Sequence, residues 1–344
     1  MKENARYQEP IDCGNAYRNT YHQGLDALLQ RLQAESVQRR DLLLPELRLR
    51  PEAFRSRLRQ TLGWPLTEPA RDRPSVRTQF VVSDDLADIY RLQIEIQPDL
   101  WMYGILFLQQ TEAPLPLVLS QHGGFGTPEL CSGFFDSGNY HDMTRRILKK
   151  GVHVFCPQLF LWHAELFGDT PYDRRQFDHA LKCVGSSIAA VELDGLQKCI
   201  DYLQTLPQVR PDSIGMIGLS YGGFYSLLLA ALDQRIQAVM SSCFFNTAEA
   251  HKEFTDCAWF NSRNQFQDAE IAALIYPRKA WIQVADHDEL FPCELAAQEF
   301  ARLKKIYEEV PSYLHFEVFQ GVHEFSESDA GIDFVVHALK DHIL

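Results

Sequence analysis

The apolar residues in the first part of the chain are spaced as in helices. Between residues 15 and 62 they recur every three or four positions, the spacing of one helix face. The positions that carry this pattern are Leu25, Leu28, Leu29, Leu32, Phe54, Leu58 and Leu62. Pro45 and Pro51 are expected to break the segment into short pieces. Because short helices are marginal in water unless they pack, we expect residues 1–75 to form a helical subdomain that rests on the remaining chain or on a second subunit.

A different pattern begins after the proline-rich segment Trp64 to Pro74, which we interpret as a linker. Short apolar runs typical of strands alternate there with helical spacing. The predicted strands are 88–97, 101–109, 115–121, 152–156, 214–218, 236–241, 280–285 and 314–319, and the main predicted helices are 189–203, 220–232, 293–307 and 331–342. The first two strands flank Pro98-Asp99, as in a hairpin, and the other six are joined by crossovers, mostly helical. Residues 76–344 are therefore predicted to be an α/β domain with an eight-stranded, mostly parallel sheet and helices on both faces.

Two connections are longer than simple turns and rich in aromatic residues. They are 157–185 and 243–267, and segments of this length usually serve function or carry small helices of their own. Trp162 in the first connection has two interpretations. It either lines a pocket over the site or belongs to a small aromatic core of the connection itself.

The strongest chemical signal is Gly218-Leu219-Ser220-Tyr221-Gly222, a G-x-S-x-G that falls where a predicted strand gives way to a predicted helix. A sharp turn at that place strains the serine backbone and presents its Oγ at the N-terminus of the helix. Glycine-rich turns with serine are common in loops, so the pattern alone is weak. The strand before it and the helix after it make Ser220 a candidate nucleophile.

A serine nucleophile needs a general base, and the base needs an acid that orients it. His323 follows the last predicted strand, and two carboxylates, Asp286 and Asp288, follow the strand before it. Asp288 is favoured, because it fits a Gly-x-x-Asp-x-x-x-Pro spacing with Ala285 in the glycine place. Asp286 then remains as a turn-forming residue.

The tetrahedral intermediate of an acyl transfer needs backbone N–H donors. One is expected from Tyr221, directly after the nucleophile, and a second from the glycine-rich turn His122-Gly123-Gly124-Phe125-Gly126. Gly124 is favoured for the second donor, with Gly123 and Phe125 as alternatives. The same turn also fits a purely structural loop after a buried strand.

Charge and cysteine content exclude several other functions. The net charge is −13; residues 1–75 hold 13 basic against 10 acidic residues, and the remainder 20 against 36. Such an acidic body disfavours nucleic acid as a partner. The eight cysteines contain no C-x-x-C pair, and the histidines show no ligand spacing, so no metal site is expected. Without a long apolar run or an apolar leader, the chain is expected to be soluble and cytoplasmic, with no membrane partner.

The elbow around Ser220, the turn His122-Gly123-Gly124 and the order Ser220, Asp288, His323 resemble the α/β-hydrolase superfamily over about residues 76–344. Within it the chain is similar to the dienelactone hydrolase, acetyl xylan esterase and cephalosporin C deacetylase group. Two departures concern the substrate: Cys156-Pro157-Gln158 stands where the carbohydrate deacetylases usually have Arg-Gly-Gln, and Ser220-Tyr221-Gly222-Gly223 looks like the elbow of the prolyl oligopeptidase family.

This resemblance implies a serine hydrolase that cleaves small esters, such as acetyl esters, without a metal or other cofactor. Phe125 and Trp162 are the expected substrate-binding residues. The alternatives are a peptidase or amidase of prolyl oligopeptidase type, and a catalytically silent scaffold that acts as a binding module. The partner is expected to be a small-molecule ester, and the N-terminal helices are candidates for a homo-oligomer contact.

Overall fold

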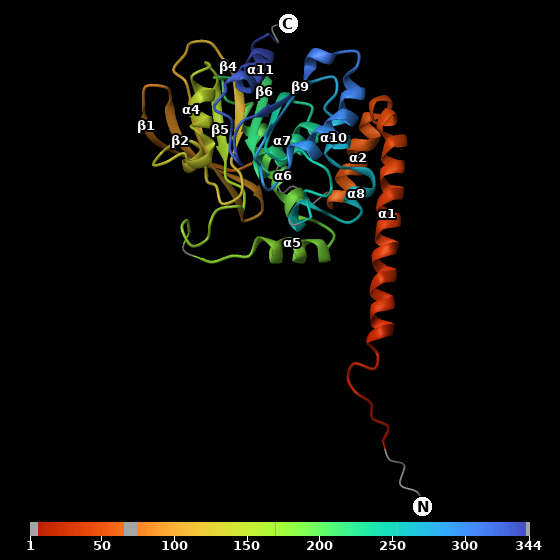
Figure 1. Cartoon of the computed structure of the whole chain (residues 1–344). Helices are drawn as coiled ribbons and strands as arrows, with labels where there is room; N and C mark the ends of the chain where they lie inside the picture. Colours follow the sequence, from red (N-terminus) through yellow and green to blue (C-terminus); the bar gives the residue numbers. More distant parts are fainter. Residues whose placement is uncertain (1–5, 65–73, 169, 253, 342–344) are drawn as a thin grey trace, which may run out of the picture.

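The computed structural model describes residues 6–64, 74–168, 170–252 and 254–341, so most of the expected linker lies outside it. One sheet runs through the molecule in the order β1-β2-β3-β5-β4-β6-β7-β8-β9 (Figure 1). Strands β1 to β3 and β5 are joined antiparallel, and β5, β4, β6, β7, β8 and β9 are mutually parallel. The strands are β1 (Val76–Ser83), β2 (Asp88–Gln97), β3 (Leu100–Leu108), β4 (Leu115–Gln121), β5 (His153–Pro157), β6 (Val209–Leu219), β7 (Ile236–Ser242), β8 (Lys279–Ala285) and β9 (Leu314–Phe319).

The described sheet has nine strands rather than the eight predicted. The additional strand, β1, pairs antiparallel with β2 at the edge of the sheet, with an irregularity between Phe80 and Val82. Its side chains are mostly exposed, because it covers little of the core. An exposed edge strand lacks the buried apolar run by which the other eight were predicted, and those eight are confirmed with shifts of a few residues at some ends.

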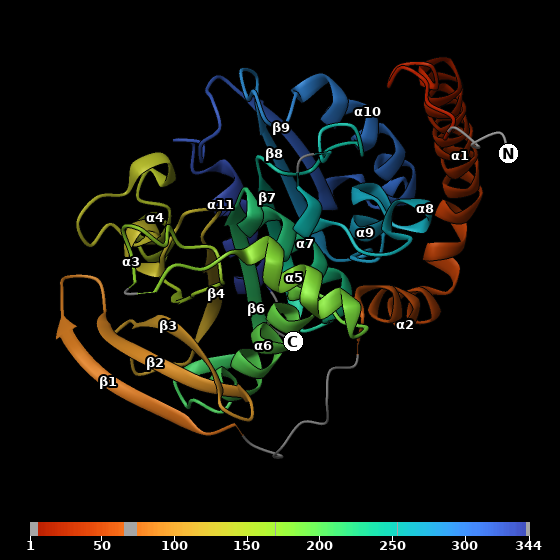
Figure 2. The same ribbon diagram turned by 90° about the horizontal axis from the view of Figure 1, so that it is seen from below.

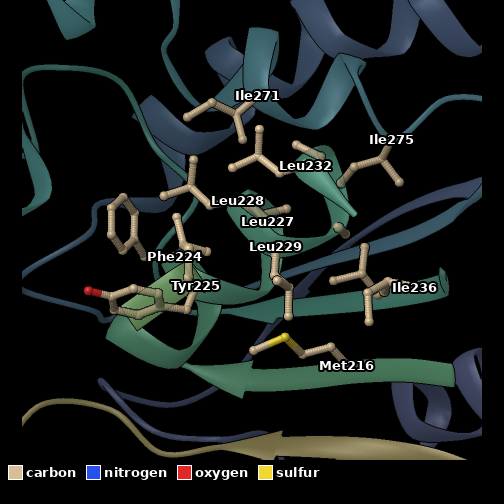
Figure 3. Packing of buried hydrophobic residues seen from close by; sticks show 14 of the residues in the cluster. Met216, Phe224, Tyr225, Leu227, Leu228, Leu229, Leu232, Ile236, Ile271 and Ile275 are labelled. Carbon is tan, nitrogen blue, oxygen red and sulfur yellow. The ribbon is translucent and has the colours of Figure 1, made fainter. Parts of the chain in front are cut away.

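Alternate residues of the central strands face two separate apolar layers. Leu117 and Leu119 of β4 point into one layer, while Val118 points into the other. The first layer lies under α6 (Ile188–Leu203), α7 (Tyr221–Leu232), α9 (Asp268–Ala273) and α10 (Cys293–Lys304). The second lies under α4 (Met143–Leu148) and α11 (Ala330–Lys340). Figure 3 shows α7 side chains filling the space between β6, which carries Met216, and α9, which carries Ile271.

The N-terminal region forms two helices, α1 (Asn15–Leu49) and α2 (Pro51–Leu62). The expected break at Pro45 is wrong, since α1 continues through it, whereas Pro51 does begin a new helix. A proline at the first position of a helix removes an N–H that has no intrahelical partner. In Figure 2, α1 lies at the opposite side of the molecule from β1.

Only part of the apolar face expected to be buried is buried. Phe54, Leu58 and Leu62 of α2 belong to the first apolar layer, together with Leu44 and Leu47 of α1. The leucines nearer the start of α1 remain between 41% and 54% exposed, namely Leu25, Leu28, Leu29 and Leu32. Helix α1 therefore contacts the body with its C-terminal part, and its first turns extend away from the body (Figure 1).

The C-terminal part of α1 is anchored by buried charges. The Arg40 guanidinium donates to Glu270 of α9 and to Glu299 of α10, at 2.6 Å each. In α2, Arg55 donates to the carbonyl oxygens of Ala231 and Leu274, at 2.8 and 2.7 Å. These contacts tie both N-terminal helices to the helical layer that covers the sheet.

Three shorter α-helices lie in the connections: α3 (Pro128–Cys131), α5 (Arg174–Cys183) and α8 (Ser262–Gln265). Helices α5 and α8 confirm that the two long connections carry helices of their own. Within the described ranges, no helix combines the length and the apolar composition needed to cross a bilayer.

Candidate active site

Ser220 lies at the turn between β6 and α7, as the G-x-S-x-G pattern predicts. Its backbone has φ 57° and ψ −123°, a strained conformation for a residue with a side chain. Gly218 and Gly222 allow this turn because the backbone packs too closely around them for a side chain. A Cβ at Gly218 would lie 2.3 Å from the backbone of Gly222, and one at Gly222 would lie 2.2 Å from the carbonyl oxygen of Gln121. The side chain of Ser220 thus stands at the N-terminus of α7, where the helix dipole favours negative charge.

His323 and Asp288, from the loops after β9 and β8, are paired. The Nδ1 of His323 lies 2.8 Å from Oδ2 of Asp288. The other oxygen of Asp288 accepts the backbone N–H groups of Leu290 and Phe291, at 2.9 and 3.0 Å. The ring of Phe291 also packs against His323, with centroids 5.6 Å apart. Asp288 is therefore a buried, fixed acceptor that orients the imidazole.

Asp286 has a different set of contacts. Its Oδ1 accepts the backbone N–H of Gly321 at 3.0 Å and lies 2.6 Å from Nδ1 of His287. The bond from Gly321, followed by the one from His287, lowers the pKa of the Asp286 carboxyl. Of the two carboxylates considered from the sequence, Asp288 is the one that pairs with His323.

The end of β7 and the residue after it lie between the turn of Ser220 and the Asp288–His323 pair. The backbone N–H of Ser220 donates to the carbonyl oxygen of Ser242 at 2.8 Å. The next residue, Cys243, places its Sγ within 4.8 Å of the nearest ligand atoms of Asp288 and His323. Cys243, Asp288 and His323 are the group of potential metal ligands found among the described residues. Two of the three, Asp288 and His323, already bond each other. Burial and the nearby Asp288 raise the pKa of the Cys243 thiol to about 12, so it is protonated at neutral pH.

The glycine-rich turn after β4 approaches Ser220 and Tyr221. A Cβ at Gly123 would lie 3.0 Å from Cβ of Ser220, and one at Gly124 would lie 3.3 Å from the ring of Tyr221. The N–H of Gly123 donates to the Tyr140 hydroxyl at 2.9 Å. Because that donor is occupied, Gly124 is the better candidate for an oxyanion donor. Tyr221 opens α7, so its N–H is one of the helix donors without an intrahelical acceptor.

His122 fixes the start of this turn as a neutral residue. Its Nε2 accepts the backbone N–H of Leu159 at 3.1 Å, which leaves Nδ1 to donate to the carbonyl oxygen of Gly123 at 2.8 Å. Burial disfavours the imidazolium and lowers the pKa of His122 to about 4, although the bond to Gly123 opposes this. We assign His122 to the support of the turn.

A short segment, 139–141, joins the two sides of the site, and no pattern in the sequence pointed to it. Asn139 donates from its side chain to the carbonyl oxygen of His323 at 3.1 Å, and its own carbonyl accepts the N–H of Phe325 at 2.8 Å. The next residue, Tyr140, holds Gly123 as described above. His141 then pairs with Glu324 at 2.9 Å. These three consecutive residues fix the glycine-rich turn relative to the loop of His323.

The aromatic residues of the first long connection form a cluster of their own. Phe160 packs against Trp162, Tyr172 and Phe177, with centroid distances of 5.1, 4.0 and 5.2 Å. Trp162 also forms an isolated β-bridge with Phe125 of the glycine-rich turn. Phe125 itself is 70% exposed and has φ 58°. The structure therefore places Trp162 within the cluster and Phe125 on the surface beside the turn.

A buried cluster of charged residues lies beside α7, the helix that follows Ser220. Arg174 of α5 bonds Glu192 of α6 at 2.9 and 3.0 Å and Asp256 at 2.7 Å. The other oxygen of Asp256 accepts the hydroxyl of Tyr221 at 2.9 Å. Both long connections are thereby linked to the residue that follows Ser220. Nothing in the spacing of these residues along the sequence indicated this contact.

Comparison with known proteins finds relatives of this chain. The sequence model of the Dienelactone hydrolase family matches residues 111–343. The Bacillus subtilis (strain 168) protein YtaP, named as a hydrolase, is 33% identical over 202 residues, which cover 54% of this chain and 64% of YtaP. A Synechocystis sp. (strain ATCC 27184 / PCC 6803 / Kazusa) protein named as a carboxymethylenebutenolidase is 30% identical over 96 residues, 28% of this chain and 39% of that protein. The matched regions thus span less than two thirds of either relative.

Solved structures share the fold at low sequence identity. A glucuronoyl esterase from Solibacter usitatus superposes with a TM-score of 0.63 at 14% identity, covering 84% of this chain and 93% of that one. Since the family match covers more than half of the chain and includes Ser220, Asp288 and His323, the chain belongs to the dienelactone hydrolase family.

Proposed function

We propose that this protein is a serine hydrolase that cleaves carboxylic esters through an acyl-enzyme. The observation that carries the proposal is the strained turn of Ser220 together with the paired Asp288 and His323. Ser242 bonds the N–H of Ser220, and the next residue, Cys243, lies beside that pair. Strain of this kind is retained where the surrounding structure requires it, and it exposes the hydroxyl for attack. Membership of the dienelactone hydrolase family supports the same reaction class.

In the proposed reaction the Ser220 hydroxyl attacks the ester carbonyl while Nε2 of His323 takes its proton. Asp288 bonds Nδ1 and thus sets the tautomer that leaves Nε2 as the base. The N–H groups of Tyr221 and Gly124 stabilise the oxyanion. His323 then protonates the leaving alcohol, and water, activated by the same histidine, releases the acid from Ser220.

The proposed substrate is a small-molecule ester with a small acyl group, such as acetyl. Phe125 is proposed as an apolar contact for the substrate because it is exposed and lies in the turn that carries Gly124. Trp162 supports Phe125 through the β-bridge between them. No metal or other cofactor has a step in this mechanism, and the expected cytoplasmic location stays a prediction.

A fluorophosphonate probe tests the nucleophile, because it reacts with activated serines only. We expect labelling of the full chain and loss of labelling in Ser220→Ala, with Ser226→Ala on the same helix as the matched control. An unlabelled chain would favour the silent scaffold. A panel of p-nitrophenyl esters and aminoacyl-nitroanilides then separates the esterase from the peptidase alternative. Turnover of nitroanilides alone would contradict the proposed ester specificity.

A further inference from the structure

The first 21 residues of α1, 15–35, extend beyond the body and form a surface that we call the α1 overhang. At 1.5 Å per residue it is about 30 Å long. The first side-chain bond from α1 to the body is that of Ser36, whose hydroxyl donates to the carbonyl oxygen of Arg263 at 2.7 Å. Figures 1 and 2 show the overhang standing apart from the sheet and its covering helices.

The overhang carries an apolar stripe that nothing described in this chain covers. Tyr21, Leu25, Leu28 and Leu32 are separated by four, three and four residues, the alternation of a helix-pairing seam. They are 72%, 46%, 41% and 47% exposed. Gly24, between them, has open space where a side chain would stand. A helix of this length with an interior glycine is marginal in water, so the stripe needs a partner.

The stripe is complementary to itself when two copies run antiparallel. Aligning them about a point between positions 26 and 27 brings Leu25 opposite Leu28 and Tyr21 opposite Leu32. The same alignment brings Arg18 of each copy opposite Glu35 of the other. A parallel pairing would instead set Arg18 against Arg18 and Glu35 against Glu35, two repulsive contacts. The charges therefore select the antiparallel arrangement.

The space around the overhang fits this arrangement. The stripe reaches the body at its C-terminal end, because Ser36, one turn after Leu32, bonds the carbonyl oxygen of Arg263, so a second helix paired along the stripe would meet the body there. In the antiparallel alignment Tyr17 of one copy comes opposite Ser36 of the other. There the body and α1 enclose a groove of about 970 Å³, lined by Leu29, Lys252 and Arg263 among others.

The N-terminal segment that precedes the overhang suits this groove. It contains Ile11, which is 94% exposed, and the acidic residues Glu9 and Asp12. The groove offers leucine side chains and an excess of basic ones, because five basic residues and two acidic residues line it, namely Arg39, Arg40, Lys252, Arg263 and Arg302 against Glu249 and Glu299. Each copy would thus place its first turns against the body of the other.

We propose that the α1 overhang binds a second copy of this chain, antiparallel and about a two-fold axis between positions 26 and 27. The dimer is held by the Tyr21, Leu25, Leu28 and Leu32 stripe and by two Arg18–Glu35 pairs. Closed two-fold pairing would cover the leucine stripe of each copy and leave none free for open-ended association. This inference does not depend on the proposed ester hydrolysis.

Light scattering after size-exclusion chromatography tests the dimer with the full chain at tens of micromolar. We expect about twice the chain mass of 39.6 kDa. Leu28→Glu puts two carboxylates into the seam and should give the monomer mass. Leu42→Glu is the matched control, since Leu42 is on the same helix but 78% exposed beyond the stripe, and it should stay dimeric. A monomeric full chain, or a dimer that survives Leu28→Glu, would overturn the proposal. Unchanged melting of the body in Leu28→Glu shows that the variant is folded.

A charge exchange tests the antiparallel alignment. Arg18→Glu and Glu35→Arg should each raise the dimer Kd about tenfold, because each creates two like-charge contacts. The double variant restores both opposite-charge pairs and should return the Kd to the starting value. Single variants without effect, or a double variant weaker than either, would reject this alignment.

Discussion

The loops of the candidate active site and the C-terminal part of α1 are both held to the body by buried polar contacts, but of different kinds. In the loops that carry Asp288 and Gly123, backbone N–H groups are the donors: two of them bond one Asp288 oxygen, and that of Gly123 bonds the Tyr140 hydroxyl. At α1 the contacts are between side chains that can both carry charge, Arg40 with Glu270 and Glu299. The contacts with backbone N–H groups fix the orientation of the site loops. Loss of one partner from the ionic contacts of α1 should instead lower the stability, because a buried charge then lacks a partner. Substitutions should therefore reduce activity in one region and stability in the other.

The largest effect is expected at Ser220 and His323, the proposed nucleophile and base. Ser220→Ala and His323→Ala should each lower kcat for a p-nitrophenyl ester by about 10⁴-fold or more, because residues that act as a unit are strongly non-additive. Both variants should melt like the parent chain. The double variant should be little worse than either single one, and additive losses would contradict a shared step.

The next largest effect is expected at Asp288, the proposed acid. Asp288→Asn should lower kcat by about 10³-fold or more, since an amide favours the wrong tautomer of His323. Asp286→Asn keeps the Asp288–His323 pair and is the matched control, with a much smaller loss. The opposite ranking would transfer the role to Asp286.

A substitution at the charged contact of α1 should lower the stability and leave the activity unchanged. Arg40→Ala leaves Glu270 and Glu299 buried with Arg302 as their remaining cationic partner, and it should reduce the free energy of unfolding by about 3 kcal/mol. Urea unfolding measures this loss, while kcat of the folded fraction should be unchanged. Arg39→Ala is the control, because Arg39 is half exposed and should cost less than about 1 kcal/mol. An Arg40 variant as stable as the parent would show that the cluster contributes no net stability.

His122, in the glycine-rich turn of the site, should make the free energy of unfolding depend on pH. Its pKa is about 4 in the folded chain, against an ordinary value of 6.5. The unfolded chain therefore takes up this proton first, and the contribution of neutral His122 is complete above pH 6.5 and lost as the pH falls toward 4. The loss amounts to about 3 kcal/mol. Urea unfolding at several pH values should show a shallower dependence in His122→Asn than in the parent, with the exposed His22→Asn as control. Equal slopes would refute the buried neutral histidine.

The same comparison separates what the sequence could predict from what it could not. Ser220, Asp288 and His323 stand at the ends of buried strands, so local pattern located them, and eight strands were found by their apolar runs. Strand β1 was missed because its side chains are exposed. Tyr140, Arg40 and Arg174 act through side chains that meet residues far along the chain, and no periodic pattern records such contacts. The division at residue 75 stays a prediction, although α2 shares the main apolar layer.

The smallest effect is expected at Tyr140, which supports the glycine-rich turn from outside the reacting groups. Tyr140→Phe removes the hydroxyl that accepts the Gly123 N–H, so the turn loses one constraint on the position of Gly124. Because oxyanion donors act mainly in the transition state, kcat should fall about tenfold while KM changes little. Tyr307→Phe is a matched control, since its buried hydroxyl donates to the carbonyl oxygen of Arg278 at 3.0 Å, just before β8 and so at the other end of that strand from Asp288, and kcat should then be unchanged. Equal kcat in the two variants would mean that Tyr140 supports only the fold, whereas a rise in KM alone would place its influence on ground-state binding.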